Sequence, residues 1–388
     1  MSGSRYLVVG GGMAADTACK AIREHDSDAA ITLVGAEPHP PYNRPPLTKG
    51  LWHGDDEGSI WRGTEEAGVE LVLGRRIVAL DPAAHRAVDA AGEAYEYDRA
   101  LLVTGGRPRR LPAANGDVVY FRTLDDYRRV RALAKPAARF VVVGGGFIGS
   151  ELAASLVSTG CAVSMVFPEA GIGARIFPGE LSAFVTDYYR ERGIDVHAGR
   201  LVAGGDDGRV RLDDGVELEA DAVVAGLGIE PAIELAGAAG IETADGIVVD
   251  ELGRTSAPDV FAAGDVARFP VAALGGTARV EHEDHAKSHG RAVGANMAGA
   301  GTPYRHLPFF YSDLFDLGYE AVGETDPRLR TMSEWREPNR TGVVCYLDDD
   351  DRPRGFLLWG VFGQVDAATA LIAARERVDA ATLRTLLG

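Results

Sequence analysis

The stretch VVVGGGFIGSEL, residues 141–152, combines an apolar run, a glycine-rich turn and the start of a small-residue helix. LVVGGGMAADTA, residues 7–18, has the same order. In such a turn the first glycine allows the tight bend, the second lets a phosphate approach the backbone, and the third position must be small so that helix and strand can pack. Two copies predict two strand–turn–helix units, each able to hold a dinucleotide pyrophosphate at a helix N-terminus.

The two turns also have their expected acidic partners. The small turn residues are Gly10, Gly12 and Ala15 in the first copy and Gly144, Gly146 and Gly149 in the second. A carboxylate about 20 residues further on binds the adenosine ribose in such units. Glu37 and Glu169 stand there and favour FAD or NAD(H), while the nearby Arg175 leaves NADPH open. We therefore predict one bound FAD, one exchanging NAD(P)H and hydride transfer between them.

Composition excludes several other classes of function. The chain has 388 residues, enough for two to three domains, and a net charge of −17, which argues against nucleic-acid binding and anionic membranes. The stretch 140–157 is the most membrane-like, but Glu151 and the glycine turn interrupt it. No signal-peptide pattern is found, so we expect a cytoplasmic protein. The separated Cys19, Cys161 and Cys345 predict neither a disulfide framework nor a four-cysteine iron–sulfur cluster.

The rest of the chain contains the same pattern of short apolar runs in two places and a different pattern toward its end. Residues 68–103 alternate short apolar runs with turn signals and predict a small inserted sheet, and residues 205–230 repeat this pattern. From residue 304 onward aromatic residues gather, and residues 365–387 have helical apolar spacing. Residues 324–342 are expected to form an irregular loop.

Three motifs resemble those of two-dinucleotide flavoprotein reductases: TGGRPR (104–109), APDVFAAGDVA (257–267) and PYNRPPLTK (41–49). The last resembles oxygenase-coupled ferredoxin reductases and apoptosis-inducing factor. FPEAGIGARIFP (167–178), RVEHEDHA (279–286) and YSDLFDLGYEAVGE (311–324) are most similar to apoptosis-inducing-factor-like members. The chain thus resembles this branch of the pyridine nucleotide-disulfide oxidoreductase superfamily.

The resemblance implies an α/β fold with two Rossmann-like domains, one for FAD and one for NAD(P)H, and a small α+β C-terminal domain. The FAD-binding domain would comprise residues 1–112 and 242–303. The NAD(P)H-binding domain would comprise residues 113–241, and the C-terminal domain residues 304–388. A monomer or a homodimer is compatible with this organisation.

The resemblance also implies roles for individual residues. Lys49 and Glu151 would form an ion pair near the reactive flavin nitrogen and, with His282, would be the catalytic residues; an ordinary structural salt bridge is the alternative for the pair. Arg44 would contact FAD, or else carry a surface charge on its proline loop. The other residues predicted to bind a cofactor are Val78, Thr104, Gly105, Arg109, Asp265, Glu281, Phe147, Ile148, Gly228, Glu230 and Tyr311.

Several features of the sequence bear on cofactor binding and on the reaction that the protein could catalyse. The family usually has an acid where this chain has Ala36, and often a tryptophan where it has Tyr311. The loop PYNRPPLTK lacks the redox cysteine that disulfide and peroxide reductases need. The segment EHEDH (281–285) places two histidines three residues apart on a predicted helix, a spacing that suits a metal ion, but its place after the Gly-Asp motif favours the flavin pocket, so no metal is predicted.

We predict a reductase that transfers hydride from NADH to FAD and then electrons to a [2Fe–2S] ferredoxin. Between Arg107 and Arg139 there are nine basic and three acidic residues, a patch that could steer an acidic ferredoxin. The alternative for this patch is a solvated helix of mixed charge, with Arg109 on the flavin. The alternatives are reduction of a quinone or other small oxidant, and an NADH-sensing flavoprotein with slow turnover and a stable charge-transfer complex.

Overall fold

The computed structural model describes residues 4–112, 117–206 and 208–388. They form two compact units. Unit 1 contains the described residues of Met1–Arg44, Glu57–Arg107 and Glu230–Pro308, and unit 2 those of Pro45–Asp56, Pro108–Ile229 and Phe309–Gly388. The chain passes between the units in β8 (Gly106–Pro108) and β17 (Ile229–Pro231). The expected start of the NAD(P)H-binding segment, residues 113–116, lies outside the described residues, and the division into three domains stays a prediction.

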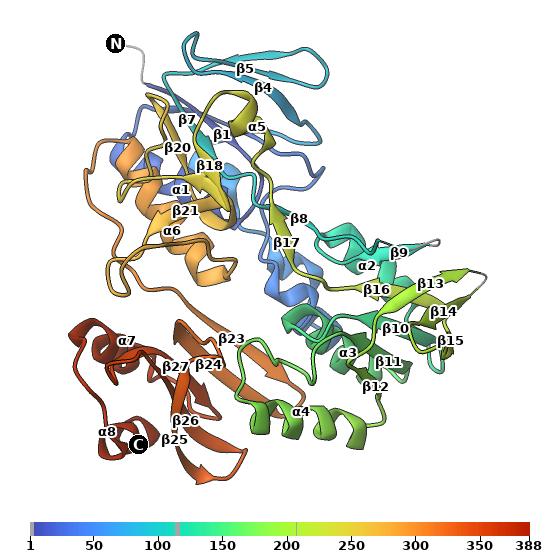
Figure 1. The fold of residues 1–388 in the computed structure, drawn as a ribbon. Helices are drawn as coiled ribbons and strands as arrows, with labels where there is room; N and C mark the ends of the chain where they lie inside the picture. The colour runs from blue at the N-terminus through green and yellow to red at the C-terminus, as the bar shows by residue number, and fades with distance from the viewer. Residues whose placement is uncertain (1–3, 113–116, 207) are drawn as a thin grey trace. The chain divides into compact units, whose positions relative to one another are not determined.

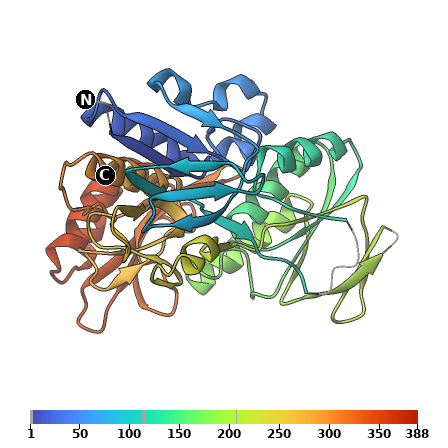
Figure 2. The same ribbon diagram turned by 90° about the horizontal axis from the view of Figure 1, so that it is seen from above.

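A parallel five-stranded sheet forms the core of unit 1 (Figures 1 and 2). Its order is β20-β7-β1-β2-β3. The strands are β1 (Arg5–Val9), β2 (Ala30–Val34), β3 (Glu70–Val72), β7 (Arg99–Leu102) and β20 (Val260–Ala262). Residues 6–9 of β1 are all buried, which is typical of a parallel strand covered on both faces.

Helices α1 (Met13–His25) and α6 (Glu283–Met297) pack closely against each other in unit 1 (Figure 1). Gly290 and Gly294 of α6 face Ala14 and Ala18 of α1, and a Cβ on either glycine would collide with the α1 backbone. Small residues on both helices therefore allow the close approach, which fixes α1 and its N-terminal turn against the rest of the unit.

Smaller elements complete unit 1. An antiparallel sheet has the order β4-β5-β6, and another sheet has the order β18-β19-β21-β22. The bounds are β4 (Ile77–Asp81), β5 (Arg86–Asp89), β6 (Ala94–Glu96), β18 (Thr243–Ala244), β19 (Gly246–Val248), β21 (Ala267–Pro270), β22 (Thr277–Ala278), α5 (Glu234–Ala238), η3 (Glu57–Ile60), η4 (Thr64–Ala67) and η5 (Gly264–Val266). The prediction of one small sheet over residues 68–103 is wrong at both ends, because β3 and β7 pair with β2 and β1 of the parallel sheet.

Unit 2 has a second parallel sheet, with the order β12-β11-β10-β16-β9. Its strands are β9 (Val118–Tyr120), β10 (Arg139–Val143), β11 (Ala162–Phe167), β12 (Asp195–Ala198) and β16 (Ala222–Ala225). Around it lie α2 (Leu124–Leu133), α3 (Phe147–Ser158), α4 (Gly179–Glu191), η1 (Pro45–Leu47), η2 (Gly50–Trp52) and the antiparallel strands β13 (Val202–Asp206), β14 (Arg209–Leu212) and β15 (Glu217–Glu219).

The C-terminal part of unit 2 is an antiparallel sheet with the order β23-β24-β27-β26-β25. Its strands are β23 (Phe309–Leu314), β24 (Leu317–Gly323), β25 (Arg330–Glu337), β26 (Thr341–Leu347) and β27 (Pro353–Trp359). Two helices pack on it, α7 (Val365–Ala374) and α8 (Ala380–Leu387). The loop predicted over residues 324–342 is wrong, because β25 lies within it. The predicted fold class, two Rossmann-like sheets and an α+β C-terminal part, is confirmed.

Candidate functional site

The first glycine turn in unit 1 joins β1 to α1. Gly10 has a φ of 131°, and a Cβ there would collide with the Val103 carbonyl, so the position requires glycine. Gly12 is the N-cap of α1 and supplies no side-chain cap, and a Cβ on it would meet no atom within 4 Å. Ala15 is fully buried in the core. The start of α1 thus has no side-chain cap and open space beside its N-cap, which suits a pyrophosphate.

The second turn, in unit 2, repeats this geometry between β10 and α3. Gly144 has a φ of 122°, and a Cβ there would collide with the Gly226 carbonyl. A Cβ on Gly149 would collide with the Gly144 carbonyl, so the third small position is a steric requirement here. Gly146 is the uncapped N-cap of α3, with no atom within 4 Å of its Cβ direction. This turn also fits a dinucleotide phosphate.

The two acids predicted to bind ribose are both paired within their own units. Glu37 accepts a hydrogen bond from Tyr42 Oη at 2.6 Å and pairs with Arg44 Nη2 at 2.6 Å. Glu169, at the end of β11, pairs with Arg175 Nη2 at 2.6 Å, and the Arg175 side chain is 81% exposed. Binding of ribose by either carboxylate stays a prediction.

Arg44 is held as a cation inside unit 1. Its guanidinium lies 5.1 Å from the centre of the Tyr42 ring. Burial opposes its charge, but the electrostatic interactions with Tyr42, Glu37 and Asp265 outweigh burial and raise the pKa of Arg44. The alternative of a loose surface charge on the proline loop therefore has little support. Sequence reasoning missed Tyr42, although it stands in the quoted motif PYNRPPLTK.

The Gly-Asp motif forms η5 at the end of β20. The Gly264 N–H donates to His289 Nδ1 at 3.3 Å, and Arg279 Nη1 donates to the Asp265 carbonyl at 3.3 Å. Arg279 also pairs with Glu281 at 2.6 Å. The motif is thus held from two sides by residues that sequence reasoning did not single out, His289 and Arg279.

His282 is the N-cap of α6, whereas His285 lies inside that helix. Burial lowers the pKa of His282 to about 4, against the opposing effect of Asp265 and Asp284. His285 stacks on Phe269 with ring centres 4.5 Å apart. In residues 4–112, 117–206 and 208–388 no group of three or more His, Cys, Asp or Glu side chains is arranged to hold a metal ion.

Further predicted residues lie at the strand ends. Thr104 Oγ1 donates to the Ala232 carbonyl at 2.8 Å, and the Gly105 carbonyl accepts the Ala232 N–H at 2.9 Å. The Arg109 N–H donates to the Gly228 carbonyl at 3.0 Å, and Gly228 has a φ of 78°. Glu230 lies in β17. Val78 lies in β4 with 52% exposure. Their contacts with a cofactor stay predictions.

The predicted pair of Lys49 and Glu151 is present in unit 2, with Nζ and Oε1 2.7 Å apart. Glu151 lies on α3 and is buried, and it accepts hydrogen bonds from Thr48 Oγ1 at 2.5 Å and Ser312 Oγ at 2.6 Å. Lys49 also pairs with the exposed Asp313 at 3.1 Å. Both carboxylate oxygens of Glu151 are therefore engaged.

Aromatic rings border this ion pair. Lys49 Nζ lies 5.3 Å from the centre of the Tyr311 ring, which stands on β23 and is 41% exposed. The first residue of α3, Phe147, contacts Phe310 edge-on with ring centres 5.2 Å apart, and Ile148 beside it is exposed. The site thus places a positive charge and an accessible aromatic ring next to each other.

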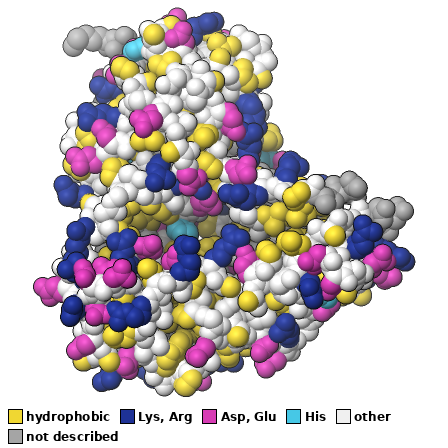
Figure 3. Space-filling view, in the orientation of Figure 1, with side chains coloured by type: hydrophobic (Ala, Val, Ile, Leu, Met, Phe, Trp, Pro, Cys, Tyr) yellow, Lys and Arg dark blue, Asp and Glu magenta, His cyan; other side chains and the backbone are white. Residues whose placement is uncertain are grey.

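In the folded chain, acidic side chains pair with several arginines of the basic segment between Arg107 and Arg139. Arg128 pairs with Asp125 and Arg129 with Asp117, both within the segment. Acids from elsewhere in the chain pair with its two ends: Glu234 with Arg107, and Glu219 and Asp221 with Arg139. In the space-filling view, basic and acidic side chains are interspersed (Figure 3). The pairing therefore reduces the local charge of +6 expected from the sequence.

Family models and individual relatives match most of this chain. The family model of pyridine nucleotide-disulphide oxidoreductases matches residues 4–290, and the model of the C-terminal part of mitochondrion-associated apoptosis-inducing factor matches residues 293–341. The ferredoxin–NAD(+) reductase component of the anthranilate 1,2-dioxygenase system of Burkholderia cepacia is 35% identical over 98% of this chain and 96% of its own length. Monodehydroascorbate reductase 3 of Arabidopsis thaliana is 36% identical, over 82% and 81%.

A solved structure is similar to this chain in fold and in sequence. Putidaredoxin reductase in its covalent complex with putidaredoxin superposes with a TM-score of 0.92 and 30% identity, over 100% of this chain and 96% of that one. In the described part of the chain no helix is both long and apolar enough to span a membrane. The predicted oxidoreductase class and the predicted cofactors, FAD and NAD(P)H, are confirmed. The chain belongs to the pyridine nucleotide-disulphide oxidoreductase family.

Proposed function

We propose that the protein is an FAD-dependent oxidoreductase that takes hydride from NADH and passes electrons to a [2Fe–2S] ferredoxin. The observation that carries this proposal is the pair of uncapped glycine turns together with the Lys49–Glu151 pair, in which the carboxylate is buried. Two relatives, a ferredoxin–NAD(+) reductase component and putidaredoxin reductase, support it. FAD, when bound, accepts a hydride and releases its two electrons one at a time.

The residues of unit 1 would hold FAD. The N–H groups at the start of α1 offer hydrogen bonds and a positive dipole end to the pyrophosphate. Arg44 adds a full charge, and the neighbouring Tyr42 and Glu37 hold its guanidinium in place. The η5 turn presents Asp265, whose carboxylate can accept hydrogen bonds from ribityl hydroxyls.

The residues of unit 2 would hold NADH and set the charge near the reacting atoms. The start of α3 offers the same anion site as that of α1, and Glu169 would bind the ribose of NADH, so NADH is the proposed donor. Lys49 would lie near the reactive flavin nitrogen, where its ammonium balances negative charge. Glu151 keeps that ammonium in position, and Thr48 and Ser312 keep Glu151 in position.

The proposed compartment is the cytoplasm, because Cys19, Cys161 and Cys345 are buried free thiols. The proposed electron acceptor is tested by steady-state oxidation of NADH with a panel of [2Fe–2S] ferredoxins and with ferricyanide. We expect at least one ferredoxin to support turnover that saturates at micromolar concentration. Turnover with ferricyanide but with none of the ferredoxins would contradict the ferredoxin proposal.

A second candidate is reduction of a small one-electron oxidant. Monodehydroascorbate reductase 3 is as similar to this chain as the ferredoxin reductases are, and the basic segment is largely paired within the protein. NADH oxidation with ascorbate and ascorbate oxidase, which generate the monodehydroascorbate radical, separates the two proposals. Faster turnover with the radical than with every ferredoxin would favour the second.

A further inference from the structure

Asp16 is a fully buried carboxylate in the first turn of α1, within one turn of the predicted pyrophosphate site. A buried carboxylate needs paired donors, since an unpaired one is strongly destabilising. A negative charge at a place that should attract an anionic ligand also needs to be neutralised. The residues that neutralise Asp16 therefore bear on the predicted FAD site.

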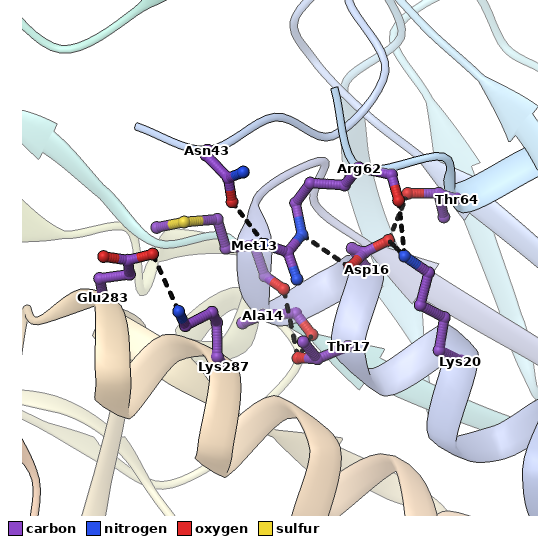
Figure 4. Close-up of polar contacts among 10 residues, drawn as sticks. All are labelled: Met13, Ala14, Asp16, Thr17, Lys20, Asn43, Arg62, Thr64, Glu283 and Lys287. Atoms are coloured by element: carbon purple, nitrogen blue, oxygen red, sulfur yellow. Dashed lines mark hydrogen bonds and ion pairs between the residues drawn. The ribbon is translucent and has the colours of Figure 1, made fainter. Parts of the chain in front are cut away.

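Three side chains bind the two oxygens of Asp16 (Figure 4). Arg62 Nε lies 2.6 Å from Oδ2, while Thr64 Oγ1 lies 2.7 Å and Lys20 Nζ 2.9 Å from Oδ1. Lys20 also donates to the Arg62 carbonyl at 2.6 Å. The charge of Asp16 is thus compensated from its own helix and from the segment before β3.

Arg62 has a second contact, which reaches the loop before Arg44. Its Nη1 donates to Asn43 Oδ1 at 2.5 Å, and Figure 4 shows Arg62 extended between Asn43 and Asp16. The backbones are joined at the same place. The Arg62 N–H donates to the Pro41 carbonyl at 3.1 Å, and the Asn43 N–H donates to the Ile60 carbonyl at 2.9 Å.

Arg44 follows Asn43 directly, so any shift of this loop moves its guanidinium. A planar guanidinium with two donors in fixed directions can connect two acceptors at once, which a lysine cannot do with the same geometry. Arg62 therefore links two parts of the predicted FAD site. One is helix α1, whose N-terminus would bind the pyrophosphate, and the other is the loop that carries Arg44. Pre-organisation of this kind raises affinity without any contact with the ligand.

We propose that Arg62, anchored on Asp16, is a positioning residue for FAD that acts through Asn43 on Arg44. This inference rests on the proposed FAD site in unit 1. The alternative is that the Asp16–Arg62 pair only stabilises the fold of unit 1. A purely structural role would lower the melting temperature without a specific effect on FAD affinity.

A double-mutant cycle tests the inference. FAD affinity is measured by flavin fluorescence on reconstituting apoprotein of the wild type, Arg62→Ala, Arg44→Ala and the double variant. We expect Arg62→Ala to raise the FAD Kd by about tenfold, in the range found for residues that orient ligand-binding groups. In the Arg44→Ala background the same change should raise it less than about twofold, because the group that Arg62 positions is gone. Glu24→Gln, which removes an exposed ion pair between α1 and α6, is the matched control.

Asn43→Ala gives a second test if Arg62→Ala does not fold. It removes the loop contact but leaves the Asp16–Arg62 pair, and we expect it to raise the FAD Kd several-fold at an unchanged melting temperature of the apoprotein. Equal effects of Arg62→Ala in both backgrounds, or an unchanged FAD Kd in Asn43→Ala, would overturn the inference alone. A wild-type protein that binds no FAD would overturn the proposed function and this inference with it.

Discussion

At the scale of single residues, Glu151 is the most constrained group of the candidate site. It is buried, and Lys49, Thr48 and Ser312 all donate to it. Lys49 has a second carboxylate within reach, the exposed Asp313. Without the charge of Glu151, the ammonium is expected to move toward Asp313 and away from its place beside the buried carboxylate.

The variant Glu151→Gln tests whether the charge of Glu151 holds the Lys49 ammonium in place. The amide keeps an acceptor for the hydroxyl groups but loses the charge, so we expect a folded protein whose rate constant for reduction by NADH falls about tenfold, or ~1.4 kcal/mol. The NADH Kd should change less than about twofold. Rapid mixing at several NADH concentrations separates the two quantities. A rate constant equal to that of the Glu24→Gln control would show that the pair is only a structural salt bridge.

Three histidines of unit 1 make stability depend on pH. Burial lowers the pKa from 6.5 to about 4 for His282 and to about 3 for His289, and it lowers that of His285 well below 6.5. Below pH 6.5 the unfolded chain therefore binds more protons than the folded one, and stability falls as the pH falls. Each histidine contributes at most about 1 kcal/mol per pH unit within this window, and less close to pH 6.5, where the unfolded histidine is only half protonated.

Urea unfolding of the FAD-free protein between pH 6.5 and 5 measures this slope. His289→Gln should make the slope shallower by the contribution of one histidine, and glutamine can still accept the Gly264 N–H. The same slope in the variant and the wild type would contradict the assignment of a neutral His289.

The residues of the site were predictable to different degrees. Glycines with local steric roles, such as Gly10 and Gly144, follow from the turn pattern alone. The pairing of Lys49 with Glu151 was accessible only through family resemblance, because the two residues are about a hundred positions apart. Ser312 and Asn43 stand within motifs that carry the resemblance, but the sequence did not single them out, since their importance depends on contacts that only the folded chain makes.

At the scale of elements, the hairpin between β23 and β24 fixes the strand that carries Tyr311 and Ser312. Leu314 pairs with Leu317, which leaves Phe315 and Asp316 as the two-residue turn. Phe315 has a φ of 60°, a left-handed conformation that is costly for a bulky residue. Its ring contacts those of Tyr188 and Tyr189 and the guanidinium of Arg192.

Comparing Phe315→Gly with Phe315→Ala separates strain from packing. Both variants lose the ring contacts, but only glycine removes the cost of the left-handed backbone. We expect both to be less stable than the wild type, with glycine about 1 kcal/mol more stable than alanine. Urea unfolding midpoints measure the difference, and an alanine variant at least as stable as the glycine variant would contradict the strained turn.

The strands of the parallel sheets were predictable where an apolar run precedes a glycine turn. The assignment of β3 and β7 to a small separate sheet failed because their partners, β2 and β1, are distant in sequence. The sequence predicts a loop instead of β25 because the residues there are largely polar or charged. It lies at the edge of its sheet and pairs with β26 only, so no buried face marks it in the sequence.

For the whole molecule, the net charge and the local charge of helix α2 have opposite expected effects on an acidic ferredoxin. The chain carries −17, which would repel an acidic ferredoxin, whereas helix α2 presents Arg128 and Arg129. Both arginines are paired with acids, so the expected steering is modest.

Reversal of both charges, Arg128→Glu with Arg129→Glu, measures the steering. We expect the KM for a ferredoxin to rise several-fold at low salt and the effect to shrink at 0.5 M salt, because screening weakens long-range attraction. The KM for NADH and the rate with ferricyanide should not change. The charge-matched control is Arg254→Glu with Arg291→Glu, which reverses two exposed, acid-paired arginines outside α2. Equal effects on ferredoxin and ferricyanide would show that α2 is no docking surface.

If the protein is a working reductase, NADH must reduce its bound FAD quickly. Anaerobic stopped-flow mixing of the purified holoprotein with one equivalent of NADH measures this, with flavin absorbance and the long-wavelength region recorded. We expect the flavin to bleach well within a second. Slow bleaching with a persistent long-wavelength band would instead indicate an NADH sensor, and a protein that cannot be loaded with FAD would contradict the proposed function.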